Sequence, residues 1–247
     1  MSSSFTIDIN ADVGEGLGNE YLLMPYLSSC NIACGGHAGN KDIMKSVVRL
    51  AKKHNVKVGA HPSFPDKLNF GRVDMKLSPD ELFYSLKSQV EGLITVLKTE
   101  NVEMYHVKPH GALYNLAAKD AVIANVILKV VKSLSSSVKL YAPYKSVIST
   151  LAKQENIDVV FEGFADRNYN DDLSLVSRQN SDALITERQA VFKHVCKMVL
   201  EQKINTINGV EVELLVNTIC VHGDTENAQV ILEYLHRNLE VNNIRVV

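Results

Sequence analysis

Short stretches of alternating apolar and polar residues recur along the chain, and longer amphipathic stretches separate them. The clearest alternation is near the start, where Phe5, Ile7 and Ile9 are interleaved with the polar residues Thr6, Asp8 and Asn10. This period of two is typical of a β-strand with two different faces. Further strands are predicted over residues 29–34, 56–60, 104–108, 138–142, 159–164 and 214–221, with a shorter one over 183–185.

Helices are predicted between these strands. Residues 41–54 place their apolar side chains on one broad face. A second helix is expected to begin at Pro79, because Ser78 can cap it and Glu81 can complete a capping box. The same capping pattern recurs in Thr186-Glu187-Arg188-Gln189. A last helix is predicted after Asp224-Thr225, and it is expected to bury Val230, Ile231, Tyr234 and Leu235.

Strands that alternate with helices indicate βα units and a parallel sheet. A closed barrel and an open, doubly wound sheet both fit this pattern. Glycines at 14, 16 and 18 do not have the G-x-G-x-x-G spacing of a dinucleotide site, and the chain contains no P-loop. Asn208-Gly209 is expected to form a turn, with a hairpin as one form of it.

Composition narrows the class of protein. The 247 residues include 26 Lys and Arg against 28 Asp and Glu, a net charge of −2 that argues against a nucleic-acid partner. The apolar runs are too short to span a bilayer, and residues 1–4 carry no signal-peptide pattern, so no membrane partner is expected. The four cysteines have no C-x-x-C spacing, which favours reduced thiols and a cytoplasmic protein.

Reactive side chains gather where the predicted strands end. Of eight histidines, four follow such ends, namely His37, His61, His110 and His222. Active sites of parallel α/β folds form at the carboxyl ends of the strands. The other polar residues that fall in these positions are Asp8, Asn10, Asp12, Glu15, Asn31, Lys108, Asp166, Arg167 and Asp224.

Two kinds of chemistry fit these residues, and the sequence leaves both open. Asp12, His37 and His61 are candidate ligands of a divalent metal, although no short H-x-x-H spacing supports them. The alternative is metal-free catalysis in which a His or Asp activates water. Lys108 and Arg167 are suited to hold a carboxylate or phosphate. Each residue also has a structural alternative: Asp8 can satisfy backbone groups, and Asp224 can cap a helix.

Seven ordered segments resemble the LamB/YcsF family, and together they extend from about residue 5 to the C-terminus. They are residues 7–16 (IDINADVGEG), 31–39 (NIACGGHAG), 59–66 (GAHPSFPD), 69–72 (NFGR), 107–115 (VKPHGALYN), 164–167 (FADR) and 221–224 (VHGD).

The resemblance implies one domain over residues 1–247, an irregular, mostly parallel α/β barrel of the glycoside hydrolase/deacetylase kind. It implies opening of 5-oxo-L-proline to L-glutamate coupled to hydrolysis of ATP, with Mg²⁺ on the nucleotide and with two further subunits, B and C. Two other functions stay open: a stand-alone metal-dependent deacetylase or amidase, and a non-catalytic subunit that binds the lactam.

On this hypothesis the strand-end residues divide into a catalytic and a substrate-binding group. Asp12, His37 and His61 surround the attacking water or a metal, and Lys108 and His110 stabilise oxyanion or phosphate charge. Asp166, Arg167, His222 and Asp224 complete the catalytic rim. The substrate-binding group is Asp8, Asn10, Glu15 and Asn31.

Two positions depart from the family pattern. Gly36 stands where the family usually has a bulky aromatic residue, so a wider pocket wall is expected there. Asp182 stands where the family usually has glycine, and a different turn is expected in that loop.

Overall fold

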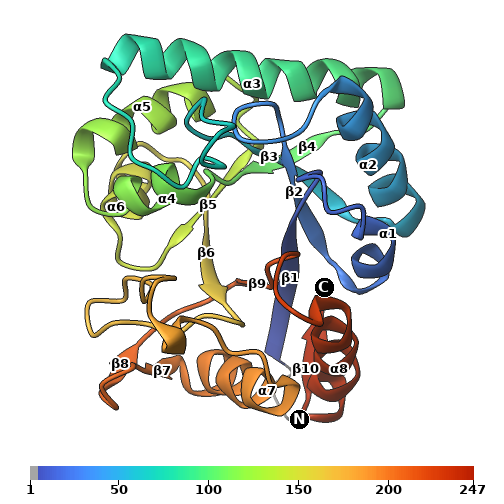
Figure 1. Ribbon diagram of the computed structural model, residues 1–247, viewed down its shortest axis with the longest axis vertical. Coiled ribbons are helices and arrows are strands. Elements are labelled where there is room, and N and C mark those ends of the chain that lie inside the picture. The colour runs from blue at the N-terminus through green and yellow to red at the C-terminus, as the bar shows by residue number, and fades with distance from the viewer. Residues whose placement is uncertain (1–4) are drawn as a thin grey trace.

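The computed structural model describes residues 5–247 and shows a parallel β-barrel surrounded by helices (Figure 1). Residues 1–4, where no signal peptide is expected, lie outside the described part. Among the described residues, seven strands form the barrel, and it closes because the last of them pairs with both its predecessor and β1. In barrel order they are β1 (Phe5–Val13), β2 (Ser29–Ala33), β3 (Lys57–His61), β4 (Met104–Val107), β5 (Lys139–Pro143), β6 (Val159–Phe164) and β9 (Thr218–Cys220).

Three further strands lie outside the barrel wall. β10 (Ile244–Val246) pairs in parallel with the first residues of β1, from Phe5 to Ile7. β7 (Lys203–Asn205) and β8 (Glu211–Glu213) form an antiparallel hairpin around the predicted Asn208-Gly209 turn.

The helices follow the strands in sequence and surround the barrel (Figure 1). No single helix in residues 5–247 is long and apolar enough to cross a membrane, and only α4 with α5, bent by 110°, passes as a pair. The α-helices are α1 (Glu20–Leu23), α2 (Lys41–His54), α3 (Pro79–Glu100), α4 (Gly111–Ala117), α5 (Ala121–Lys132), α6 (Val147–Gln154), α7 (Arg188–Cys196) and α8 (Ala228–Val241). Shorter turns are η1 (Met24–Tyr26), η2 (Ser181–Ala183) and the π-helical η3 (Lys197–Glu201).

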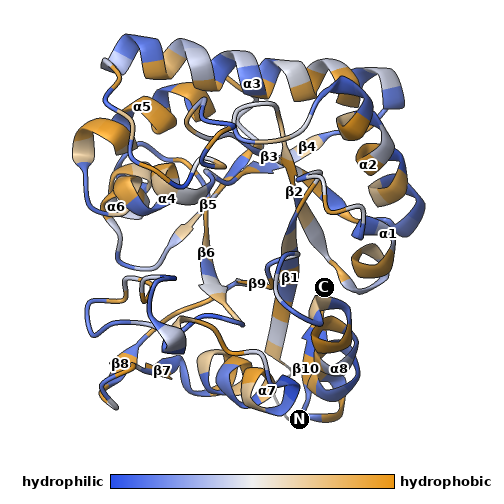
Figure 2. Cartoon of the chain, viewed as in Figure 1, coloured by the Kyte–Doolittle hydropathy of each residue, from blue (hydrophilic) through white to orange (hydrophobic). Residues whose placement is uncertain are grey.

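Local sequence explains where the long helices start and stop. The capping box predicted at Ser78 and Glu81 is present at the start of α3. α2 spans the predicted residues. The Asn40 side chain caps its first turn, and the helix ends at Asn55, which adopts a left-handed conformation. Apolar and polar residues alternate along α3 (Figure 2), and the apolar side chains are buried against the barrel.

The barrel interior is polar, which is unusual because branched apolar residues commonly fill such barrels. Along β1, Ile7, Ile9 and Ala11 are buried in the hydrophobic core. Asp8, Asn10 and Asp12 alternate with them and contact polar side chains of other barrel strands. The alternation in the sequence therefore marks an inner polar face and an outer apolar face, both buried.

The structure corrects several predicted elements in the second half of the chain. The strand predicted over 214–221 is limited to β9, because the Leu214 amide turns away to donate to Gln202. The segment 183–185 is no strand; it begins at the last residue of η2 and makes one isolated bridge, from Leu184 to Arg167. Glu187, not Thr186, caps α7, since its carboxylate accepts the amides of the first turn.

The last helix also differs from the prediction. α8 begins after Asn227 rather than after Asp224, whose carboxylate instead accepts from arginine side chains. Ile231 and Leu235 are buried as expected, but Val230 is 41% exposed because it points away from the barrel side of the helix. His194 is half-buried in α7, and this burial lowers its pKa to about 4.

Candidate functional site

A pocket of about 440 Å³ opens at the carboxyl ends of the barrel strands, where the predicted reactive residues gather. This volume lies within the range of ordinary small-molecule sites. Because each strand ends at this side of the barrel, loops that are distant in sequence meet around one cavity. The predicted site residues that line it are Asp12, His61, Lys108, His110, Arg167 and His222.

Lys108 is a buried cation held between two carboxylates. Its Nζ lies 3.0 Å from Asp12 Oδ1 and 2.9 Å from Glu162 Oε1. A third contact, 3.2 Å long, goes to the sulfur of Cys220. Burial alone would lower the pKa of Lys108, but the two carboxylates outweigh it and hold that pKa well above its usual value. Lys108 is therefore charged at neutral pH.

Side-chain amides on neighbouring strands hold the Asp12 carboxylate in place by hydrogen bonds. The Asn31 amide nitrogen donates to Asp12 Oδ1 at 2.8 Å and to Asn10 Oδ1 at 2.7 Å. Its oxygen then faces His106 Nε2 at 2.6 Å, so this nitrogen must carry a proton. Gly59 leaves room for the His106 ring, since a Cβ at this glycine would lie 2.2 Å from Nε2. Asn10 and Asn31 thus position the carboxylate rather than line the pocket.

Asp8 lies deeper in the barrel, away from this pocket. Its carboxylate accepts from Ser29 Oγ at 2.7 Å and Thr218 Oγ1 at 2.6 Å, and it lies 3.6 Å from Lys57 Nζ. Lys57 begins β3, so this group sits toward the amino-terminal end of the barrel. The structure does not bring Asp8 together with the other predicted site residues, because period two fixes its face but not its depth.

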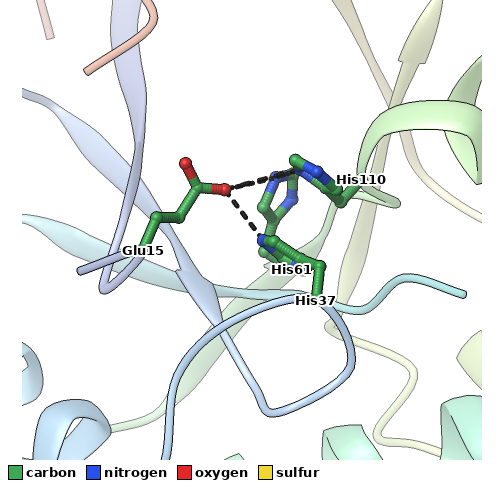
Figure 3. A group of neighbouring side chains, drawn as sticks. All are labelled: Glu15, His37, His61 and His110. Atoms are coloured by element: carbon green, nitrogen blue, oxygen red, sulfur yellow. Dashed lines mark hydrogen bonds and ion pairs between the residues drawn. The ribbon is translucent and has the colours of Figure 1, made fainter. Parts of the chain in front are cut away.

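Three histidines and a glutamate converge beside the pocket (Figure 3). Glu15 Oε1 lies 2.8 Å from His37 Nε2 and 3.4 Å from His110 Nδ1. His61 Nε2 lies 2.9 Å from His110 Nδ1 and 3.3 Å from Asp12 Oδ2. The rings of His37 and His110 are stacked, with centroids 3.7 Å apart. These four residues follow or end β1, β2, β3 and β4, and we call them the Glu15–His cluster.

Burial and neighbouring charge set the protonation of this cluster. Burial, together with the nearby Asp12 carboxylate, raises the pKa of Glu15 to about 7. Burial also lowers the pKa of His37 to about 4 and holds that of His110 well below its usual value. Both rings are therefore neutral at pH 7.

Asp166 and His222, which follow the neighbouring strands β6 and β9, form a second polar pair at the rim. Asp166 Oδ1 lies 2.9 Å from His222 Nδ1, and Oδ2 accepts the His222 amide and the Thr225 hydroxyl. Burial disfavours the charged carboxylate, but His222 and Thr225 outweigh it and lower the pKa of Asp166. Since the carboxylate only accepts, Nδ1 carries a proton, which leaves Nε2 as the ring nitrogen that can act as a base.

Asp224 sits between two arginines at the pocket. Its Oδ2 lies 2.7 Å from Arg72 and 3.4 Å from Arg178, so one negative charge faces two positive ones. Arg167 is buried and donates to the carbonyls of Ala183 and Val176. Arg167 thereby fastens the loop that carries Arg178, while Arg72 and Arg178 supply the cationic wall.

The two departures from the family pattern have simple local explanations. A Cβ at Gly36 would lie 2.4 Å from Gln89 Oε1 and 2.5 Å from Ser63 Oγ. The expectation of a wider pocket wall is therefore wrong, because Gln89 and Ser63 fill the space. Asp182 does not adopt the left-handed conformation that favours glycine, and its carbonyl accepts from Asn168.

The sequence analysis gave no role to four side chains of this site, namely Glu162, Arg72, Arg178 and Tyr114. Glu162 lies near the end of a predicted strand, but only the folded chain shows that it reaches Lys108, 54 positions away in the sequence. Arg72 belongs to residues 69–72, one of the segments that resemble the family, and nothing else in the sequence marked it as a site residue. Tyr114 likewise belongs to such a segment, residues 107–115, whereas Arg178 lines the pocket without any pattern that marks it.

Known proteins similar to this chain share its full length. Residues 7–247 match the model of the LamB/YcsF family. A protein of Bacillus cereus strain 03BB102, named as the A subunit of 5-oxoprolinase, is 41% identical, with 98% of each chain covered. A crystal structure of a lactam utilization protein from Thermus thermophilus has a TM-score of 0.92 at 36% identity, covering 98% of this chain and 99% of that one. A GH18 chitinase of Pseudoalteromonas aurantia shares only the fold, with a TM-score of 0.54 at 9% identity over 94% of this chain and 100% of that one.

Proposed function

This chain belongs to the LamB/YcsF family, and on that premise we propose that it is the A subunit of an ATP-dependent 5-oxoprolinase. It opens 5-oxo-L-proline to L-glutamate together with subunits B and C. The observation that carries this proposal is the charged Lys108 at a small pocket whose wall bears Arg72 and Arg178. Such a pocket suits a compact lactam that carries a carboxylate.

The positive wall gives the substrate its orientation. Arginine binds carboxylates through two parallel hydrogen bonds. Arg72 and Arg178 share the single carboxylate of Asp224, which leaves one positive charge for the carboxylate of 5-oxoproline. The lactam ring then extends toward Lys108 on the same pocket lining.

Lys108 stabilises the charge that develops on the lactam oxygen. An ammonium has three hydrogen-bond donors, and here they face Asp12, Glu162 and the Cys220 sulfur. A thiol sulfur is a weak acceptor, so the lactam oxygen replaces it as the third partner. The gain is largest when that oxygen becomes negative, as an oxyanion-stabilising group requires.

ATP makes the ring opening favourable. Transfer of the terminal phosphoryl group to the lactam oxygen releases ADP and activates the carbonyl carbon. Water attacks this carbon, the C–N bond breaks with protonation of nitrogen, and γ-glutamyl phosphate forms. A second water hydrolyses it to glutamate and phosphate. His222, oriented by Asp166, is placed to take the proton from the first water.

Partner subunits supply the nucleotide chemistry. The sequence contains no P-loop, so we assign binding of ATP and its Mg²⁺ to subunits B and C or to their contact with this pocket. The four cysteines are free thiols, which supports assembly in the reducing cytoplasm.

The decisive experiment is glutamate release from 5-oxoproline and ATP by this chain alone, by subunits B and C alone, and by all three. We expect release only from the complete mixture. Arg72→Gln should raise the KM for 5-oxoproline, whereas Arg237→Gln, on the exposed side of α8, should not. Release by B and C without this chain, or none from any mixture, refutes the proposal.

A stand-alone metal-dependent amidase is the second candidate, favoured by the Glu15–His cluster. It predicts hydrolysis of acetyl amides by this chain alone, with added Zn²⁺ and without ATP. A purely lactam-binding role predicts instead that rim variants leave the turnover of the complete mixture unchanged.

A further inference from the structure

We propose that Glu15, His37, His61 and His110 bind one divalent cation of the Zn²⁺ class. The proposed ring opening assigns no metal to this chain, so the site goes beyond it. Cation binding can also be measured without turnover, so the two proposals can fail separately. Each residue comes from a different strand end, and their four ligand atoms lie within 4.8 Å of one another (Figure 3).

Two of the histidines have their outer nitrogens fixed by backbone carbonyls. His61 Nδ1 lies 2.7 Å from the carbonyl oxygen of Lys108, and His110 Nε2 lies 2.9 Å from that of Phe70. A carbonyl oxygen only accepts, so each of these nitrogens carries the proton. Metal-binding histidines characteristically donate their other nitrogen in this way, which fixes both tautomer and ring orientation.

The inner nitrogens of the same rings then face each other as acceptors. His61 Nε2 and His110 Nδ1 are 2.9 Å apart, and in neutral rings both present a lone pair. Two lone pairs at this distance repel each other unless a positive species lies between or beside them. Glu15 Oε1 adds a third acceptor, 3.4 Å from His110 Nδ1 and 4.0 Å from His61 Nε2.

The spacing of these atoms matches a metal better than a single shared proton. Ligands about 2.0–2.1 Å from a tetrahedral Zn²⁺ are about 3.3 Å apart. Four of the six ligand separations are 2.8, 2.9, 3.4 and 4.0 Å, on both sides of that value, and all six are within 4.8 Å. A proton bridges only two atoms, whereas here His37 Nε2 converges on the same Glu15 oxygen as well.

A neighbouring group with similar chemistry is not a cation site. Asp12, Cys220 and His222 also place ligand atoms close together. However, the Lys108 ammonium lies 3.0 Å from Asp12 Oδ1 and 3.2 Å from the Cys220 sulfur. This positive charge occupies the position that a cation would need. Asp12 still contributes to the Glu15–His cluster, because its Oδ2 lies 3.3 Å from His61 Nε2.

Direct binding measurements test the proposal on the full chain prepared without a histidine tag. After removal of metal with a chelator, the protein is titrated with Co²⁺ and then with Zn²⁺. Metal content is measured by mass spectrometry and Co²⁺ geometry by visible absorption. We expect one ion per chain, a tetrahedral Co²⁺ spectrum that Zn²⁺ abolishes, and a higher Tm with Zn²⁺.

Three variants make the result specific. Glu15→Gln and His110→Asn should each weaken Zn²⁺ binding at least tenfold and remove the Zn²⁺-dependent rise in Tm. His54→Gln, at the end of α2 and outside the cluster, should leave both unchanged. Circular dichroism shows whether each variant folds. Glu15 lies in a loop, where a substitution is tolerated best. If His110→Asn does not fold, Zn²⁺ binding by Glu15→Gln therefore decides whether the cluster is the site. Failure of the wild-type chain to bind Zn²⁺, or unchanged binding by Glu15→Gln, overturns the proposal.

Discussion

Replacement of Lys108 by Met tests whether the buried charge network holds the barrel together. Met has a similar length, so the change removes the charge and keeps most of the volume. Lys108 is 2% exposed, and its ammonium lies 3.0 and 2.9 Å from two buried carboxylates, Asp12 and Glu162. The variant leaves both carboxylates in the interior without their cation.

The expected loss of stability is large. At an effective dielectric constant of about 20, one unit pair 3 Å apart attracts by about 5 kcal/mol before desolvation is counted. Removal of one partner from a buried ion pair typically costs about 3–5 kcal/mol. We therefore expect Lys108→Met to lower the free energy of unfolding by about 3–5 kcal/mol.

An exposed ion pair provides the matched control. Lys132 Nζ lies 2.9 Å from Glu155, the same distance as Lys108 from Glu162, but the Lys132 side chain is 54% exposed. Lys132→Met should cost less than about 1 kcal/mol because water screens the pair. Adding Glu162→Gln to Lys108→Met should restore part of the loss, since it removes one uncompensated charge.

Urea unfolding followed by far-UV circular dichroism measures these differences. The chain has no tryptophan and nine tyrosines, so tyrosine fluorescence serves as the second probe of two-state behaviour. A loss below about 1 kcal/mol for Lys108→Met, or an equal loss for Lys132→Met, would refute the argument from burial.

Three further predictions address other parts of the molecule. Asp166→Asn should lower kcat of the assembled enzyme about 10²–10⁴-fold, because His222 loses the group that orients it; near-normal turnover would exclude this pair. Gly59→Ala should destabilise the fold by at least about 1–3 kcal/mol in urea unfolding, since its Cβ meets the buried His106 ring; unchanged stability would show that the ring can move. Burial lowers the pKa of His194 to about 4 in the folded chain. As pH drops, the His194 ring is therefore protonated in the unfolded chain before it is protonated in the folded one, and the free energy of unfolding falls. Between about pH 7.5 and about pH 5.5 this one group removes about 1.3 kcal/mol, relative to an unfolded pKa of about 6.5. His194→Gln should flatten the measured pH dependence of unfolding by that amount, and an unaltered slope would contradict it.

The pattern along the sequence was sufficient to predict a parallel α/β fold and the strand ends at which the reactive side chains gather. Alternation along β1, the capping box at Ser78 and the extent of α2 are local features, and local residues determine them. The gathering of His37, His61 and His110 follows from parallel strands alone, since their carboxyl ends meet. These expectations needed no knowledge of distant contacts.

Depth within the barrel and pairing across it could not be predicted. Period two places Asp8 and Asp12 on the same face of β1, but the stagger of the strands decides that one meets Ser29 and the other Lys108. The ion pair of Lys108 with Glu162 joins strands that are not neighbours in the barrel. The start of α8 was misplaced for a similar reason, because Asp224 is bound by distant arginines.

The pairing of β1 with the last strands has a consequence for synthesis of the chain on the ribosome. β1 is made first, yet two of its three neighbours, β9 and β10, are among the last segments to emerge. The barrel cannot close until they do, and such long-range contacts slow folding. Until then the backbone edge of β1 that pairs with β9 and β10 has no partner. A nascent chain of this protein is therefore expected to depend on protection by chaperones until β9 and β10 have emerged.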